Sequence, residues 1–332
     1  MDALKGRLTS AGYALGWTVV RRMPEAWARR LFMLIAEIAW RRQGRGVQQL
    51  EANLRRVIGP AATGAELRSL SRAGMRSYLR YFLEIFRLPV ISQQRIVADM
   101  HSNGAEETAF AYMAAGRGVV FALPHMGNWD HAGAWISARG AGSFTTVEEH
   151  LRPEALYQQF LAFRESLGFE ALPLTGGASP FGVMAQRLRA GRLVCLVCDR
   201  DLTASGVEVT FFGEPARMAA GPAALAVQTG AALMPVTLFY DGDYWCADIN
   251  EEIPVPPEGT RKEKVAAMTQ QMARVFEAGI RAHPEDWHML QKVFVADLDP
   301  GRLAAAAARA VTPEGAPEGA PESVPESTEP CG

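Results

Sequence analysis

Residues 118–130 read GVVFALPHMGNWD, and this stretch decides how the chain is organised. The apolar run at 119–123 is typical of a buried strand, which Pro124 ends. Asn128 is a good N-cap, so a helix is predicted over 128–138 with a carboxylate in its first turn. His125 therefore lies between the carboxyl end of a strand and the amino end of a helix, where open α/β sheets bind their ligands.

His125 and Asp130 have the chemistry of an acid–base pair. A carboxylate five positions after the histidine can reach back across the turn to the imidazole, and such a pair can act as a general base. A single histidine after a strand is also compatible with a structural role, and spacing alone does not separate the two.

Length and charge set the outline of the protein. The chain has 332 residues, of which 48% are hydrophobic, enough for one large domain or two small ones. Residues 1–90 carry 16 Lys and Arg against 6 Asp and Glu, a net charge of +10 that leaves −12 for the rest of a chain whose total is −2. This basic third predicts an anionic membrane surface as a partner, and no nucleic acid is expected.

Residues 1–58 are predicted to form helices in which Trp and Leu alternate with Arg, a composition typical of helices at a membrane interface. Ordinary amphipathic helices packed on a core are the alternative, but the net charge of the group favours lipid. The longest apolar runs, 11–20 and 31–40, fall short of the ~20 residues that span a bilayer. No cleavable signal peptide is recognised.

A long helix is predicted over 65–88. Its arginines at positions 68, 72, 76 and 80 recur every four residues and form one basic stripe. The stripe could face solvent, bind phosphates or face lipid, and the sequence does not decide between them.

From residue 118 the pattern alternates between strands and helices. Strands are predicted over 119–123, 143–147, 170–174, 193–198, 207–212, 233–239 and 244–249, and helices over 128–138, 153–167, 180–190, 221–229 and 260–282. This alternation predicts an α/β fold with a mostly parallel central sheet flanked by helices. The short connection between 193–198 and 207–212 allows an antiparallel pair, which would make the sheet mixed. We expect one domain over 1–298, with basic amphipathic helices at 1–90 and the catalytic core at 91–298.

Two other features carry no chemistry. Residues 299–332 are rich in Pro, Glu, Ala and Gly and poor in large apolar groups, so a disordered tail is predicted. Cys195 and Cys198 form a CxxC, but residues three apart on a strand point to opposite faces. Both are therefore predicted to be core thiols in a reducing compartment, and no metal site is expected.

Charged residues gather where the ligand crevice of the sheet should lie. They occur in VEEHLRP (147–153), FRESLG (163–168), CDRD (198–201) and FFGEPARM (211–218). Each stretch alone is compatible with a cap, a turn or a surface ion pair. Four of them beside a His-x4-Asp motif indicate one site.

At these residues the chain resembles a known superfamily. HMGNWD (125–130) is similar to the His-x4-Asp motif of the glycerolipid and lysophospholipid acyltransferases, and its Gly-Asn-Trp is typical of the branch of bacterial lipid A late acyltransferases. The resemblance narrows to the actinobacterial phosphatidylinositol mannoside acyltransferases, over about residues 8–297. The segments that narrow it are DRDL (199–202), SGVEV (205–209), FFGEP (211–215), AGP (220–222) and DWHMLQ (286–291).

The resemblance implies an acyl-CoA-dependent O-acyltransferase. It implies transfer of a long acyl chain, palmitoyl, to the 6-hydroxyl of the mannose on C2 of inositol in a phosphatidylinositol mannoside. The enzyme would lie peripherally on the cytoplasmic face of the plasma membrane and hold the acyl chain in an apolar channel. Acyl-CoA would be a co-substrate, and no other cofactor is expected.

The resemblance also implies a role for each of several residues in this chain. His125 would be the general base that takes the sugar hydroxyl proton, because a neutral hydroxyl is a weak nucleophile. Asp199 stands where these enzymes carry Glu and would hold the imidazole, a role that Asp130 could share or supply. Charged positions lining the site are matched by Glu149 and Arg164, and those expected to shape the acceptor pocket or bind phosphate are Arg200, Glu214 and Arg217.

Two residues depart from the pattern of the family. Met126 stands where small residues are usual and is expected to narrow the approach to His125. Asp199 is one methylene shorter than Glu, which would shift the orienting task toward Asp130 unless the backbone compensates.

Three other functions stay open at this point. The acceptor could be another glycolipid or a lysophospholipid, although DRDL argues against the lipid A branch, where a Pro-Asp-Gln segment is usual. A thioesterase could use His125 and a carboxylate to activate water, since the lack of a Gly-x-Ser-x-Gly motif excludes only the serine variety. A non-catalytic membrane module would leave His125, Asp130 and Asp199 unexplained.

Overall fold

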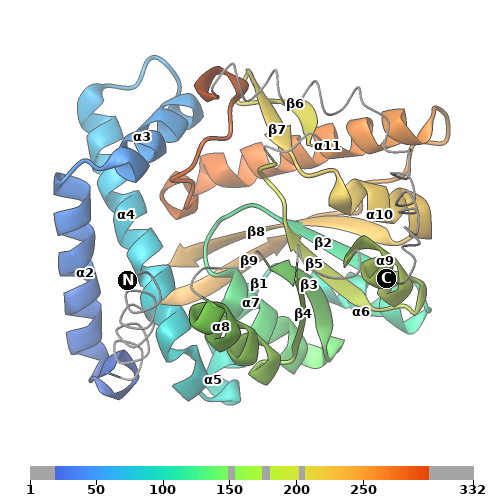
Figure 1. Cartoon of the computed structure of the whole chain (residues 1–332), viewed down its shortest axis with the longest axis horizontal. Helices are drawn as coiled ribbons and strands as arrows, with labels where there is room; N and C mark the ends of the chain where they lie inside the picture. The colour runs from blue at the N-terminus through green and yellow to red at the C-terminus, as the bar shows by residue number, and fades with distance from the viewer. Residues whose placement is uncertain (1–18, 149–153, 174–179, 202–205, 299–332) are drawn as a thin grey trace, which may run out of the picture.

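The structure, a computed structural model, describes residues 19–148, 154–173, 180–201 and 206–298 (Figure 1). The predicted tail, Glu149 and the first 18 residues lie outside these ranges. The α-helices are α2 (Glu25–Arg41), α3 (Arg45–Ile58), α4 (Gly64–Arg87), α5 (Gln93–Ala98), α6 (Glu106–Ala114), α7 (Trp129–Ile136), α8 (Glu154–Ser166), α9 (Pro180–Arg189), α10 (Gly221–Thr229) and α11 (Arg261–Ala282). The strands are β1 (Met100–Ser102), β2 (Val119–Leu123), β3 (Phe144–Glu148), β4 (Phe169–Pro173), β5 (Leu193–Val197), β6 (Val207–Phe211), β7 (Glu214–Met218), β8 (Ala232–Asp241) and β9 (Tyr244–Ile249). Short turns of other helix types are η1 (Leu88–Val90), η2 (Ser137–Ala141), η3 (Pro284–Asp286) and η4 (Val295–Asp297).

Within the described residues, seven strands form one sheet in the order β1-β9-β8-β2-β5-β3-β4. The strands from β8 to β4 run parallel, whereas β9 pairs with β8 in the antiparallel direction and β1 follows β9. This confirms the predicted α/β fold with a mostly parallel but mixed sheet. The antiparallel pair suggested for 193–198 and 207–212 is wrong, because β5 lies between β2 and β3. β6 instead forms a separate hairpin with β7.

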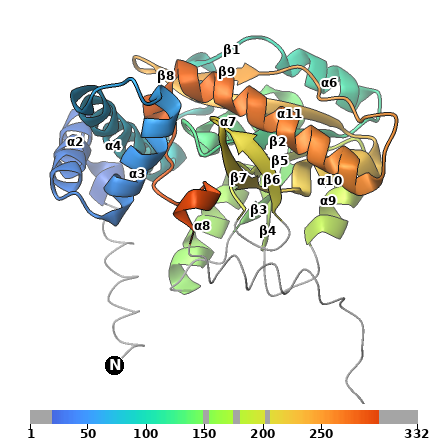
Figure 2. The same cartoon turned by 90° about the horizontal axis from the view of Figure 1, so that it is seen from above.

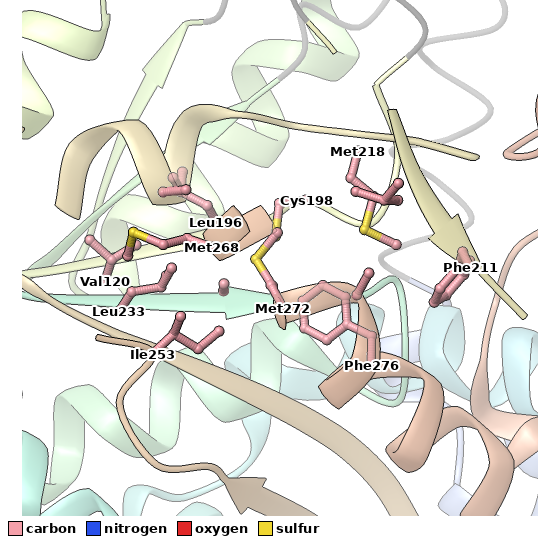
Figure 3. Close-up of a cluster of buried hydrophobic side chains, with 14 of the residues drawn as sticks. Val120, Leu196, Cys198, Phe211, Met218, Leu233, Ile253, Met268, Met272 and Phe276 are labelled. Carbon is pink, nitrogen blue, oxygen red and sulfur yellow. The ribbon is translucent and has the colours of Figure 1, made fainter. Parts of the chain in front are cut away.

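Helices cover both faces of the sheet, so the domain has three layers (Figures 1 and 2). The alternation of side chains along each strand divides the core accordingly. On β2, Val120 packs with the cluster under α9, α10 and α11, while Phe121 packs with the cluster under α5 to α8. Cys198 lies in the first cluster beside Met272 of α11 (Figure 3), and Cys195 packs against the second. Both thiols are free and lie on opposite faces, as predicted.

The helices α2, α3 and α4 pack together at one end of the sheet (Figure 1). Three arginines of the α4 stripe pair with carboxylates of this bundle, and their side chains stay 40–46% exposed. Arg72 and Arg76 both pair with Glu37 of α2, and Arg68 pairs with Glu51 of α3. The partners of these three arginines are therefore carboxylates of the neighbouring helices. The division expected at residue 90 stays a prediction, and α4 contacts the α/β core directly.

Candidate active site

The loop between β2 and α7 holds His125 at the carboxyl edge of the sheet. Asn128 caps α7 as predicted, since its side chain accepts a hydrogen bond from the His131 amide at 2.9 Å. Gly127 has a φ of +59°, and a Cβ there would lie 2.7 Å from backbone atoms of Leu238. Only glycine combines that backbone conformation with so close an approach. The Gly-Asn pair of the motif therefore sets the path of the chain that presents His125.

Asp199 is the carboxylate that holds His125. The His125 Nδ1 and an Asp199 carboxylate oxygen are 2.5 Å apart, and the His125 amide donates to the other oxygen at 3.0 Å. The Trp287 indole donates to that same oxygen at 2.9 Å. Because the carboxylate occupies Nδ1, the proton lies there and the lone pair of Nε2 stays free. The His125 side chain is 37% exposed and Asp199 is fully buried, so a substrate can reach the histidine but not the carboxylate.

The electrostatics of Asp199 fit this pairing. Burial by itself would raise the pKa of Asp199, but the charge and hydrogen bond of His125 and the Trp287 indole hold it below its ordinary value. The carboxylate thus stays ionised and can stabilise an imidazolium formed beside it. Although Asp199 is shorter than the Glu expected there, it still bonds the imidazole, and Asp130 does not take over this role.

Asp130 belongs to a second polar cluster. Its carboxylate accepts from the Arg164 guanidinium at 2.8 Å and from the Tyr81 hydroxyl at 2.9 Å. Arg164 also pairs with Glu148 at 3.0 Å. The charged neighbour of Arg164 is thus Glu148, one position before the expected Glu149, which lies outside the described residues. Burial raises the pKa of Glu148, and Arg164 offsets this only in part.

An apolar cavity lies beside these residues, between the sheet and α7. Its walls come from β2, β5, β8 and α7, and include Phe121, Val197, Leu238 and Trp129. Asp130 and Arg164 are among its few polar wall residues. The Trp129 ring contacts the His125 imidazole edge-on, with centroids 5.8 Å apart. Trp129 therefore contacts the His125 imidazole and also lines the apolar cavity.

The remaining predicted residues lie beyond β5 and on the β6–β7 hairpin. Arg200 directly follows Asp199 and is half-buried. Arg217 of β7 donates to the Gly206 carbonyl at 2.7 Å, and its own carbonyl accepts from the Asp201 amide at 2.9 Å. Glu214 pairs with Arg56 of α3 at 2.8 Å, which ties the hairpin to the helical bundle. The acceptor-binding roles of Arg200, Arg217 and Glu214 stay predictions.

Met126 does not narrow the approach to His125 as expected. It is fully buried and packs in the cluster under α11. Its backbone forms an isolated bridge with Trp287. The unusual size of this residue is therefore taken up by the core beneath the site.

Sequence reasoning missed the residues that α4 and η3 contribute. Glu84 of α4 is buried and accepts hydrogen bonds from Asn128, Tyr240 and Trp245, all within 3.0 Å. Trp287 follows η3 and holds Asp199. The DWHMLQ segment was recognisable as a motif, but only the folded chain shows what its side chains contact.

Comparison with known proteins shows the family of the chain. Residues 2–295 match the family of bacterial lipid A biosynthesis acyltransferases. A phosphatidylinositol mannoside acyltransferase of Mycolicibacterium smegmatis is 48% identical over 303 residues, which cover 91% of this chain and 96% of that protein. One of Mycobacterium tuberculosis is 47% identical over 305 residues, which cover 91% of this chain and 93% of that protein.

An α/β sheet with a carboxylate-backed histidine in a His-x4-Asp motif, together with these matches, defines an acyltransferase. The chain belongs to the bacterial lipid A biosynthesis acyltransferase family.

Proposed function

We propose that this acyltransferase moves a long acyl chain, palmitoyl, from acyl-CoA to the 6-hydroxyl of the mannose on C2 of inositol in a phosphatidylinositol mannoside. The observation that carries the proposal is the His125–Asp199 pair, whose imidazole is partly exposed and contacts Trp129 of the apolar cavity. The acceptor class rests on the names of the two mycobacterial relatives. Acyl-CoA is the co-substrate, and the proposal includes no further cofactor.

In the proposed reaction, Nε2 of His125 takes the proton of the sugar hydroxyl while its oxygen attacks the thioester carbonyl. Asp199 stabilises the imidazolium through Nδ1. The tetrahedral intermediate then collapses, the C–S bond breaks, and the imidazolium returns its proton to the departing CoA thiolate. The products are the acylated sugar and free CoA, and His125 is neutral again.

The apolar cavity is the proposed site for the acyl chain. Its walls are aromatic and aliphatic side chains of the sheet and α7, which suit methylene groups and offer few hydrogen bonds. Arg164, Asp130 and Glu148 lie on its polar side. We propose that this buried ion-pair cluster shapes the polar end of the channel, whereas His125 does the proton transfer.

The outer face of α2 is the proposed membrane contact. Trp27, Leu31, Leu34 and Ile38 follow helical spacing and are 39–66% exposed. Exposed arginines flank this stripe at positions 22, 30, 41 and 42. Large apolar groups beside cations fit an interface of anionic lipid. Of the described helices, none is long and apolar enough to cross a bilayer. From the resemblance and from this apolar and basic face of α2, we propose a peripheral position on the cytoplasmic face of the plasma membrane.

The test uses the purified full-length protein, radiolabelled palmitoyl-CoA and an unacylated phosphatidylinositol dimannoside in liposomes of anionic lipid. Wild type should label the glycolipid, His125→Ala should not, and the exposed His101→Ala is the matched control that should retain activity. Label released as free palmitate without labelled glycolipid would instead indicate hydrolysis. In a parallel assay with an added lysophospholipid, label on that lipid and none on the dimannoside would show that the acceptor is a lysophospholipid.

The membrane contact has its own test. Flotation with liposomes of anionic and of neutral lipid measures binding apart from chemistry. A Trp27→Ser and Leu34→Ser double variant should lose binding to anionic liposomes and keep its thermal stability, because both side chains are exposed. Unchanged flotation of this variant would argue against α2 as the contact.

A further inference from the structure

Three consecutive residues after α11 contact the loop that holds the base. The backbone carbonyl of Asp286 accepts from the Gly127 amide at 2.9 Å, and the His288 amide donates to the His125 carbonyl at 2.7 Å. Between them, the Trp287 indole donates to the Asp199 carboxylate at 2.9 Å. The segment therefore contacts both the histidine and its carboxylate.

The position of the Trp287 ring is fixed by packing. The residue is fully buried, and Phe211 and Phe212 of the β6–β7 hairpin contact its ring with centroids 5.9 and 6.0 Å away. A ring held in this way cannot turn its N–H toward another acceptor without repacking the core.

The residues on either side of Trp287 are anchored to other elements. The Asp286 carboxylate accepts from the Ser77 hydroxyl of α4 at 2.5 Å and from the Tyr240 amide at 2.9 Å. The His288 ring is 2.8 Å from the same Ser77 oxygen. The segment is thus tied to α4 and β8, so the indole N–H is presented from a rigid support.

The indole has a particular effect on the carboxylate it contacts. One oxygen of Asp199 receives two donors, the Trp287 indole and the His125 amide, and the other oxygen faces the imidazole. Two donors on one oxygen fix the rotation of the carboxylate and draw negative charge away from the imidazole side.

We propose that Trp287 is a positioning residue of the acyl transfer, which orients Asp199 through its indole N–H and limits how strongly that carboxylate binds the imidazolium. The inference rests on the proposed function only in that His125 is taken as the base. Without this donor, Asp199 holds the imidazolium more strongly, so the base becomes available only at higher pH. A less well-aimed imidazole also lowers kcat, while the binding of acyl-CoA is unaffected.

The donor can be removed with little change of volume. Replacement of Trp287 by 3-benzothienylalanine exchanges the N–H for sulfur in a ring of nearly the same shape, and Trp287→Phe removes the donor by ordinary mutation. Phe211→Leu is the matched control, because it disturbs the same aromatic cluster without touching Asp199. In both Trp287 variants kcat should fall about tenfold with KM for acyl-CoA unchanged, and the acid limb of the pH–activity profile should move up by about 0.5–1 pH unit.

A second readout needs no acyl transfer at all. Diethyl pyrocarbonate modifies neutral imidazole, so its rate at His125, followed by peptide mass spectrometry against pH, reports when the base is free. The midpoint at His125 should move to higher pH in both Trp287 variants but not in Phe211→Leu, and the exposed His101 serves as an internal control. A shift without glycolipid acylation would refute the proposed substrate and keep the positioning role. The inference would be overturned if the His125 midpoint did not move in the Trp287 variants and their loss of kcat were no greater than that of Phe211→Leu.

Discussion

His125 and His288 are neighbours with opposite surroundings. The His288 amide donates to the His125 carbonyl, and each imidazole has a buried carboxylate nearby. The imidazole of His125 is 37% exposed and bonds its carboxylate directly. His288 is buried, and the Ser77 hydroxyl stands between its ring and Asp286. Burial, and to a lesser extent His125, lowers the pKa of His288 to about 3.

The difference shows what a histidine needs in order to act as a base. An imidazole whose pKa is about 3 is neutral at neutral pH, but it is too weak a base to take a proton from a hydroxyl. His125 has both requirements, a free nitrogen that a substrate can reach and a carboxylate that stabilises the charged ring. His131 resembles His288, since it is fully buried and stacks on Trp245 with centroids 3.8 Å apart.

The largest effect is expected from His125→Gln. It removes the base while keeping a polar side chain of similar length, so kcat should fall by about 10³-fold, within the range for a lost general base. The free energy of unfolding should change by less than about 1 kcal/mol, because the Gln amide can still donate to the buried Asp199 carboxylate. Steady-state transfer rates and urea unfolding check both. If transfer persisted, His125 would not be the base and the contrast with His288 would fail.

The next effect concerns pH and stability. Burial lowers the pKa of His131 from 6.5 to about 4. The unfolded chain therefore takes up this proton near pH 6.5, whereas the folded protein takes it up only near pH 4. Stability should thus fall as the pH is lowered through this window, and His131 should account for roughly 2–3 kcal/mol of the loss.

His131→Phe tests this expectation, because phenylalanine can stack on Trp245 without titrating. Urea unfolding at pH 6.5 and pH 4 should show a shallower loss in the variant than in wild type. An equal loss in both proteins would mean that His131 is already protonated in the folded state.

Ser77→Ala should have a smaller effect, on stability more than on chemistry. It leaves the Asp286 carboxylate without its hydroxyl donor and the His288 ring without its partner, which should cost about 2 kcal/mol of unfolding free energy. Transfer by the folded variant should fall less than tenfold. If Ser77→Ala instead lost as much transfer as His125→Gln at unchanged stability, the proton transfer would involve Ser77, Asp286 and His288, and the assignment to His125 would be wrong.

The smallest effect is expected from Asp199→Glu, which introduces the residue that the resemblance leads one to expect. Asp199 is fully buried and both oxygens are already used, so an extra methylene must push the imidazole from its place. Transfer should fall about tenfold. A rise in kcat would show that the backbone here is not adapted to the shorter side chain.

The sequence predicted the parts of the fold that depend on local pattern. β2, the Asn128 cap and the long α4 and α11 helices follow from apolar runs and capping residues, and they form where expected. β1 has only three residues and β7 contains Pro215, so neither shows the alternation of apolar and polar residues that predicts a strand.

The sequence could not decide which carboxylate holds His125. That choice depends on the register of β2 and β5, which pairs Leu123 with Val197 and so brings the residues two positions further on side by side. Asp130 is closer in sequence but is held by Arg164 and Tyr81. The role of the arginine stripe was similarly undecided, because Arg68 and Arg72 pair with carboxylates on α3 and α2, far away in the chain.

One face of α4 carries Ser77, Tyr81 and Glu84 at helical spacing, and these reach Asp286, Asp130 and Asn128 respectively. A fragment that begins at residue 91 would thus keep every strand of the sheet and every residue of the dyad, yet lose one buried partner from each of three polar groups around it. Trimming the protein to an α/β core for crystallisation or expression would remove these three supporting contacts beside its active site. Any shortened version has to keep α4, or supply that helix as a separate peptide.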